Sequence, residues 1–330
     1  MKRLPFIFLC AAILALANSR TPYAAQSPTA TTPRKVAITI DDLPGAWPQS
    51  PAGRLDILQR VNRAIPQILN AHHAPAIGFV NEGKLQVTGE RDARVALLQM
   101  WIDAGLALGN HTYSHANVDE MPVERYEDDI IRGEAVTQPL LAAAGQTERY
   151  FRHPYLFTGP SMEARNEIES FLAKRDYRIA PVTVENADYE FTPIWHEALE
   201  KHDDGLASRV KQEYLAYTEH VFDFYQAESR ELFGRDIAQV LLIHDNELNA
   251  DALDTLLTIL EHRGYKFVSL DEALTDPAYA TPDRYVSKIG PVWLERWKIA
   301  LGRQPDFEHD PDPPEWVRKM SADISRRASK

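Results

Sequence analysis

The chain has 330 residues and a hydrophobic content of 44%, so it can bury one large core or two ordinary ones. Its formal net charge of -12 disfavours nucleic acids and anionic membranes as partners, and a neutral or cationic ligand is easier to accept. The only cysteine, Cys10, lies near the N-terminus, so the remainder of the chain has neither disulfides nor cysteine metal ligands.

The N-terminal residues 1–25 have the order of a secretory signal peptide. Lys2 and Arg3 precede an apolar run over residues 4–17, and small residues suited to cleavage follow. The run is shorter than the ~20 residues that a membrane-spanning helix needs. We therefore expect export to the periplasm or the medium, with no stable membrane insertion after cleavage.

Strand and helix patterns alternate from Lys35 onward. Short β-branched or apolar runs predict strands at KVAITI (35–40), AIGFV (76–80), LALGN (106–110), RYFRHP (149–154), YRIAPV (177–182), QVLLIH (239–244) and YKFVSL (265–270). Apolar residues at helical spacing predict helices near 55–69, 95–101, 123–144, after Ser161 and at 250–262. This alternation predicts a mostly parallel sheet, and about seven strands favour its closure into a (β/α) barrel.

Two segments do not fit the repeat. Residues 193–235 are charged, helical and rich in aromatics, which indicates a helical insertion within a catalytic domain at 33–275. From its position alone, we expect it to cap a substrate groove. Residues 276–330 form a C-terminal extension whose three tryptophans we expect to pack against the barrel and whose end we expect to be disordered.

Metal-ligating residue types collect where the first and third strands end. Asp41 and Asp42 follow KVAITI, and two adjacent carboxylates at a buried strand end repel each other unless a cation or donors stabilise them. If the chain makes one helical turn after LALGN, His111 and His115 point the same way. Two imidazoles and one carboxylate suit zinc with a position open for water, although an H-x-x-x-H pair alone is weak evidence.

Other strand ends add polar residues at the same rim, where barrel enzymes carry their active sites. Arg152 and Tyr155 lie at the end of the fourth predicted strand, RYFRHP. Glu185 and Asp188 follow the next predicted strand, YRIAPV, and His244 ends QVLLIH. A structural ion pair or a buried core histidine would explain each one separately. Together they indicate an active site.

Five motifs occur in order along the chain, and any one of them alone would be weak. They are TIDD (39–42), HTYSH (111–115), RHPY (152–155), ENADY (185–189) and LIH (242–244). With them the sequence resembles the polysaccharide deacetylase family, the NodB-like carbohydrate esterase family four, from Lys35 to about Leu274. The resemblance implies an α/β fold of the distorted (β/α)7 barrel type and a carbohydrate substrate.

The resemblance also implies a metal-dependent hydrolase that acts on carbon–nitrogen bonds other than peptide bonds. A divalent metal, usually zinc, would be held by Asp42, His111 and His115. The residues alone leave open which aspartate binds it; the family pattern gives Asp42 to the metal and Asp41 to the base. Water activated by the metal would attack an N-acetyl group.

The remaining roles follow from the same resemblance. His244 would be the acid that protonates the leaving group, with Asp188 orienting it. Arg152 would hold Asp41 ionised. The backbone N–H of Tyr155 would stabilise the oxyanion, and Tyr189 and Leu242 would line the pocket for the acetyl methyl group.

Departures from the family pattern leave the substrate open. Leu43 replaces the usual glycine, Tyr189 the tryptophan of the fourth motif, and Glu185 its first aspartate. The nearest alternative is an O-acetyl esterase on acetylated polysaccharide. A second is an inactive carbohydrate-binding protein, and a third is a non-haem iron triad. The oligomeric state is also open.

Overall fold

The computed structural model describes residues 33–46, 54–286, 289–305 and 307–328. The expected signal peptide at 1–25 lies outside these ranges. Within them, the helices are all too short or too polar to cross a membrane.

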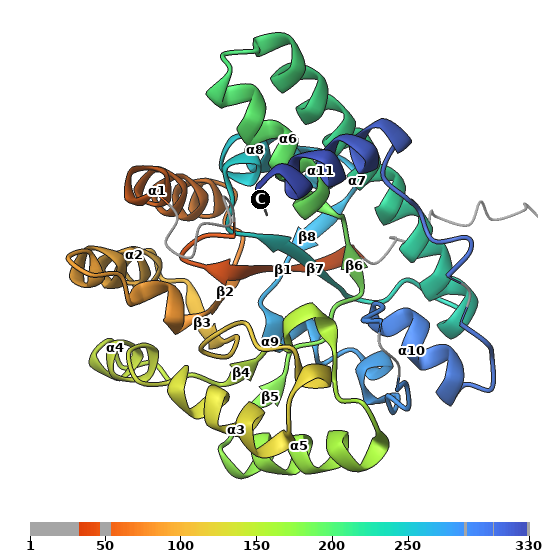
Figure 1. The fold of residues 1–330 in the computed structure, drawn as a ribbon. Coiled ribbons are helices and arrows are strands. Elements are labelled where there is room, and N and C mark those ends of the chain that lie inside the picture. The colour runs from red at the N-terminus through yellow and green to blue at the C-terminus, as the bar shows by residue number, and fades with distance from the viewer. Residues whose placement is uncertain (1–32, 47–53, 287–288, 306, 329–330) are drawn as a thin grey trace, which may run out of the picture. The chain divides into compact units, whose positions relative to one another are not determined.

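A curled parallel sheet forms the centre of the barrel (Figure 1). Its strands are β1 (Arg34–Leu43), β2 (Ala76–Val80), β3 (Ala107–Asn110), β4 (Tyr150–Phe151), β5 (Arg178–Ile179), β6 (Val184–Glu185), β7 (Gln239–His244) and β8 (Tyr265–Phe267). Seven of them follow the order β5-β4-β3-β2-β1-β7-β6, and β8 pairs with β1 outside this path. The sequence prediction of a distorted (β/α)7 barrel is confirmed.

Helices surround the sheet. They are α1 (Leu55–Ala71), α2 (Arg91–Asp103), α3 (Val123–Arg132), α4 (Thr137–Ala143), α5 (Met162–Lys174), α6 (Asp188–Glu200), α7 (Asp204–Phe233), α8 (Glu247–His262), α9 (Leu270–Ala273), α10 (Trp293–Ala300) and α11 (Glu315–Ala328). Short 3-10 turns are η1 (Glu82–Leu85), η2 (Val118–Glu120), η3 (Pro154–Leu156) and η4 (Pro277–Ala280).

The single helix predicted at 123–144 is instead the pair α3 and α4. The break follows Gly133, where a Cβ would lie 3.0 Å from Asn110 Oδ1 and 3.1 Å from the backbone of Thr112. Gly133 therefore packs directly against Asn110 and Thr112 at the end of β3, where a larger residue would not fit.

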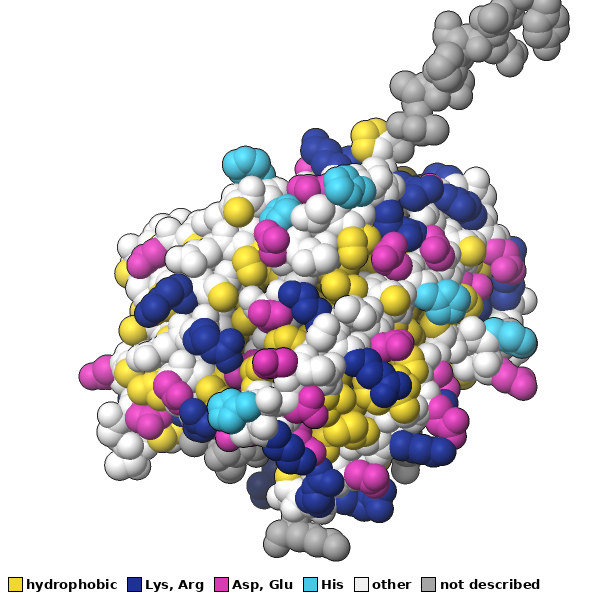
Figure 2. All heavy atoms as spheres, turned by 90° about the horizontal axis from the view of Figure 1, so that it is seen from above, with side chains coloured by type: hydrophobic (Ala, Val, Ile, Leu, Met, Phe, Trp, Pro, Cys, Tyr) yellow, Lys and Arg dark blue, Asp and Glu magenta, His cyan; other side chains and the backbone are white. Residues whose placement is uncertain are grey.

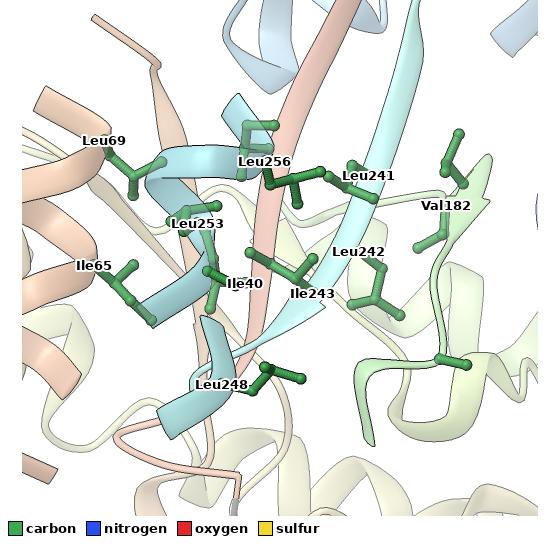
Figure 3. Packing of buried hydrophobic residues seen from close by; sticks show 14 of the residues in the cluster. Ile40, Ile65, Leu69, Val182, Leu241, Leu242, Ile243, Leu248, Leu253 and Leu256 are labelled. Carbon is green, nitrogen blue, oxygen red and sulfur yellow. The ribbon is translucent and has the colours of Figure 1, made fainter. Parts of the chain in front are cut away.

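The main core lies between the sheet and the helices α1 and α8 (Figure 3). Ile40 of β1 and Ile243 of β7 meet Ile65 of α1 and Leu253 of α8, and all four side chains are fully buried. Strands buried on both faces read as continuous apolar runs, which is why KVAITI and QVLLIH were recognisable as strands. This packing fixes the carboxyl ends of β1 and β7.

The segment 193–235 corresponds to α7 and most of α6. Helix α6 already begins at Asp188, five positions before the predicted start of the insertion. Along α7, one stripe with Tyr214, Tyr217, Phe222 and Tyr225 is buried.

On the face of the molecule shown in Figure 2, Lys and Arg side chains are mixed with Asp and Glu side chains.

The expectation of a disordered C-terminal end is wrong for residues 315–328, which form α11. Val317 and Ile324 lie on one face of this helix and are buried, so the segment has enough apolar contact to be ordered. Trp293 and Trp297 are buried, as expected, and Trp316 packs against the main core.

Candidate active site

The adjacent aspartates Asp41 and Asp42 both line one cavity. In a regular strand, neighbouring side chains point to opposite faces. Here the β1–β2 register is irregular between Ile40 and Leu43, and Asp42 has a left-handed φ of 74°. This local bulge re-aims one of the two side chains, so that both carboxylates serve the same site.

The two histidines follow β3 in a loop rather than in the helical turn that the sequence predicted. Thr112 and His115 have φ values of 61° and 57°, which a helix does not allow. Asn110 Oδ1 accepts a hydrogen bond from Thr112 N at 2.8 Å, and Thr112 Oγ1 accepts one from Ala116 N at 3.0 Å. These bonds hold the loop that brings His111 and His115 together.

Asp42, His111 and His115 each offer one ligand atom, and these atoms lie within 4.8 Å of one another. His115 Nε2 is 3.6 Å from Asp42 Oδ1. His111 Nδ1 is 2.7 Å from Arg152 O, which assigns the ring proton to Nδ1 and leaves Nε2 free as a ligand. Burial lowers the pKa of His111 well below its usual value, so the ring is neutral, as a ligand must be.

Lys84 is a contact of the site that the sequence analysis missed. Its ammonium Nζ forms an ion pair with Asp42 Oδ1 at 3.0 Å. Oδ1 is a buried atom that accepts no well-aligned hydrogen bond. Burial alone would raise the pKa of Asp42, but the charges of Lys84 and His115 outweigh it and hold that pKa well below its usual value. An ionised carboxylate with one oxygen that accepts no hydrogen bond, beside two imidazoles, fits a divalent cation.

Asp41 is held by Arg152, which is fully buried. Arg152 Nη1 lies 3.3 and 3.2 Å from the two carboxylate oxygens, while its other nitrogens donate to Thr39 Oγ1 at 3.0 Å and Ala180 O at 2.9 Å. Burial raises the pKa of Asp41 to about 6, against the opposing charge of Arg152. Asp41 is therefore a carboxylate that can take up a proton near neutral pH.

His244 stands opposite Asp41 in the register of β1 and β7. Its Nδ1 lies 2.6 Å from Asp188 Oδ1, so Nε2 is the nitrogen left for the cavity. Burial would lower the pKa of His244, but the Asp188 carboxylate outweighs it and raises the pKa to about 10. Asn246 and Asn249 donate to Asp188 Oδ2 and fix that carboxylate in turn.

The cavity has a volume of about 1220 Å³. Tyr155, with φ 58°, is half exposed on one side, and its ring lies edge-on to His115 at 4.5 Å. Tyr189 lies on the other side, with its ring 6.0 Å from His244. Leu242 and Glu185 also line the cavity. Glu185 accepts a hydrogen bond from Ala187 N at 2.6 Å, and burial raises its pKa to about 7.

All ten residues expected at the site gather there. Eight line the cavity: Asp41, Asp42, His111, His115, Tyr155, Tyr189, Leu242 and His244. Arg152 and Asp188 lie directly behind Asp41 and His244. The strand-end rule could have found Lys84, four residues after β2, and Asn246 and Asn249, two and five residues after β7.

Residues 29–170 match the family model described as polysaccharide deacetylase. The sequence has no match among curated proteins. Among solved structures, a mutant CE4 family pseudoenzyme "with restored enzymatic activity" is 21% identical, with 73% of this chain and 68% of that chain covered and a TM-score of 0.50. This likeness confirms the fold.

Two further structures are similar at lower TM-scores. The unmutated CE4 family pseudoenzyme, from Bacillus anthracis, is 20% identical, with 73% of this chain and 66% of that chain covered and a TM-score of 0.49. A polysaccharide deacetylase from Bacillus cereus is 18% identical, with 72% of this chain and 91% of that chain covered and a TM-score of 0.47.

Proposed function

We propose that this chain, whose residues 29–170 match the polysaccharide deacetylase family model, is an exported, metal-dependent hydrolase that removes N-acetyl groups from a glycan. The observation that carries the proposal is the placement of Asp41 and His244 on opposite register positions beside the Asp42–His111–His115 cluster. A proton acceptor, a proton donor and a ligand set for a Lewis acid thus share one cavity.

Asp42, His111 and His115 would hold the divalent metal, for which we propose zinc. When bound, the metal would supply a lowered pKa for water and a polarised acetyl carbonyl. Asp41 takes the proton from the attacking water at a carboxylate oxygen. Arg152 keeps Asp41 ionised and aimed, because its guanidinium lies against both of the oxygens.

His244 completes the proton transfer at the leaving group. Its pKa of about 10 keeps the imidazole protonated at neutral pH, so Nε2 can donate to the departing amine. Asp188 orients the ring through Nδ1 and stays ionised while the imidazolium gives its Nε2 proton to the leaving group. The backbone N–H of Tyr155 stabilises the oxyanion, while Tyr189 and Leu242 enclose the acetyl methyl group.

Two other functions use the same residues. An O-acetyl esterase would need the same base, acid and cation, and it differs only in the bond that breaks. A carbohydrate-binding protein without turnover would not need the Asp41–Arg152 and Asp188–His244 pairs, which have a purpose in proton transfer. These pairs favour the enzyme over the binding protein.

Acetate release by the purified protein tests the proposal. We expect release from N-acetylglucosamine oligomers to exceed release from acetylated xylan, and to be lost in Asp41→Asn and in His244→Ala. The reverse order of substrates would make the protein an esterase. No release by the native protein, with oligomer affinity preserved in Asp41→Asn, would establish the binding protein instead.

A further inference from the structure

We propose that two C-terminal segments, Ile289–Gly290 and α11, form walls of the active-site cavity that restrict the substrate to short N-acetylated glycans or to the terminal units of longer ones. The substrate chemistry in this inference rests on the proposed function. The two wall segments themselves lie outside both the sequence motifs and the matched family region, 29–170.

The first wall stands beside Tyr155. A Cβ on Gly290 would lie 1.9 Å from Tyr155 O, so the two backbones are in direct contact. Ile289 lines the cavity and is half exposed there. Arg296 of α10 donates a hydrogen bond to Leu156 O and thereby ties the C-terminal region to the same turn.

The second wall is one face of α11. Arg318, Ala322 and Ser325 are spaced i, i+4 and i+7, so they lie on one side of the helix, and all three line the cavity. Val317 and Ile324 lie on an adjoining face and are buried. The helix therefore presents its polar and small residues to the cavity and uses its apolar ones as an anchor.

Helix α11 is fixed to α6, which itself lines the cavity. Arg327 forms an ion pair with Glu197 of α6, and the Arg209 guanidinium of α7 lies 3.9 Å from the ring centroid of Trp316. Figure 1 shows α11 beside α6, in agreement with their extensive contact. A helix anchored by these contacts limits the length of the cavity in a way that a disordered C-terminal segment would not.

The two walls stand on different sides of the reacting groups. The Gly290 wall adjoins Tyr155, whose ring contacts His115, whereas the α11 wall adjoins α6, whose Tyr189 ring lies against His244. A long polymer needs an open groove on both sides of the sugar that loses its acetyl group. Walls on both sides favour a short chain or a chain end.

The test compares substrates of increasing length. We would measure kcat/KM for acetate release from N-acetylglucosamine oligomers and from the polymer, with the full chain, with Ala322→Trp and with Lys319→Trp. Ala322 is exposed to the cavity, whereas Lys319 is exposed on α11 but does not line it. A chain ending at Pro314, which lacks α11, is the fourth protein.

For the native chain we expect kcat/KM to stop rising at a short oligomer length. Ala322→Trp should lower kcat/KM by about tenfold for the longest oligomer accepted and less for the shortest, whereas Lys319→Trp should match the native chain. Loss of α11 should raise the ratio of polymer to short-oligomer activity by about tenfold.

Identical length profiles for Ala322→Trp and the native chain would overturn the inference, whether or not the truncated chain folds. Oligomer affinities, measured by calorimetry in an Asp41→Asn background with and without Ala322→Trp, separate the two proposals. Length-dependent affinity that Ala322→Trp weakens, without acetate release by the native chain, would support the walls and contradict the hydrolase. Affinity that Ala322→Trp leaves unchanged would contradict the walls.

Discussion

At the scale of single residues, the charges of Asp41 and His244 are set by different partners. Burial raises the pKa of Asp41 to about 6 even though Arg152 opposes it. For His244, burial acts in the opposite direction, and Asp188 outweighs it to give a pKa of about 10. Between these values the base is ionised and the acid protonated, which is the state that the proposed reaction needs.

The pH dependence of kcat/KM should follow from this pair. Activity rises as Asp41 loses its proton, with a rising limb no higher than about pH 6, and falls as His244 loses its proton near pH 10. In Asp188→Asn the neutral amide no longer stabilises the imidazolium, so the falling limb should move to lower pH. Glu190→Gln alters a cavity acid that does not contact His244 and should leave the limb in place. An unmoved falling limb in Asp188→Asn would contradict the assignment of His244 as the acid.

Lys84 predicts a change in metal affinity. Its ammonium lies 3.0 Å from a carboxylate oxygen that the proposed metal would use, so two cations compete for Asp42. Replacing Lys84 by Met should therefore tighten zinc binding by about tenfold, since roughly 1.4 kcal/mol of charge competition corresponds to that factor.

Titration calorimetry of zinc into metal-free protein would measure this change. The matched control is Lys35→Met, which removes the same charge from an ion pair with Glu272 at the opposite end of β1. Equal affinities for Lys84→Met and Lys35→Met would show that Lys84 does not compete with the metal.

At the scale of elements, the strands place Asp41 and His244 at the site, and the loops after β1 and β3 orient Asp42, His111 and His115. The apolar runs of β1 and β7 and the residues that follow them were enough to predict that Asp41 and His244 meet at one rim. The sequence did not reveal the bulge at Asp42 or the left-handed Thr112 and His115. Both segments are held by hydrogen bonds from other elements: Lys84 Nζ donates to Asp42 O, and Ser114 N donates to Asp129 Oδ2. The predicted helical turn for the two histidines was wrong for this reason.

The C-terminal elements were also beyond sequence reasoning. A charged segment such as α11 resembles a disordered tail until its partner surface is known, because its core-packing apolar residues are few: Trp316, Val317, Met320 and Ile324. Its contact with α6 is tertiary, and no local pattern encodes it. The motifs therefore predicted residues that line the cavity but not the contribution of α11 to it.

Helix α8 predicts a measurable loss of stability. Leu253 is fully buried against the sheet that carries Asp41 and His244 (Figure 3). Leu253→Ala should lower the free energy of unfolding by about 2–5 kcal/mol, because the lost burial is joined by a cavity that close packing cannot refill. Leu301→Ala removes the same atoms from a side chain that is 43% exposed, and denaturant unfolding should show a much smaller change there. Equal losses in the two variants would contradict this account of the core.

At the scale of the whole molecule, a buried acid away from the site couples stability to pH. Glu148 is buried, and burial raises its pKa from 4.5 to about 8 although it accepts a hydrogen bond from Tyr177 Oη at 2.5 Å. The folded protein thus keeps a proton that the unfolded chain releases above its usual pKa. The stability from this group is fully present below about pH 4.5 and falls as the pH rises toward 8.

Glu148→Gln should remove this dependence. We would measure the free energy of unfolding by urea denaturation between pH 5 and pH 8, in steps of about one pH unit. It should fall less steeply with pH in this variant than in the native protein, by up to about 1.4 kcal/mol per pH unit. Parallel curves for the two proteins would show that Glu148 is already ionised in the folded state.

We propose that Asp42, His111 and His115 make this protein a metal-dependent N-deacetylase. The most direct measurement is acetate release from an N-acetylglucosamine oligomer before chelation, after chelation and after zinc is restored. We expect chelation to abolish acetate release and zinc to restore it, with no restoration in His115→Ala. Release that survives complete removal of the metal would contradict it.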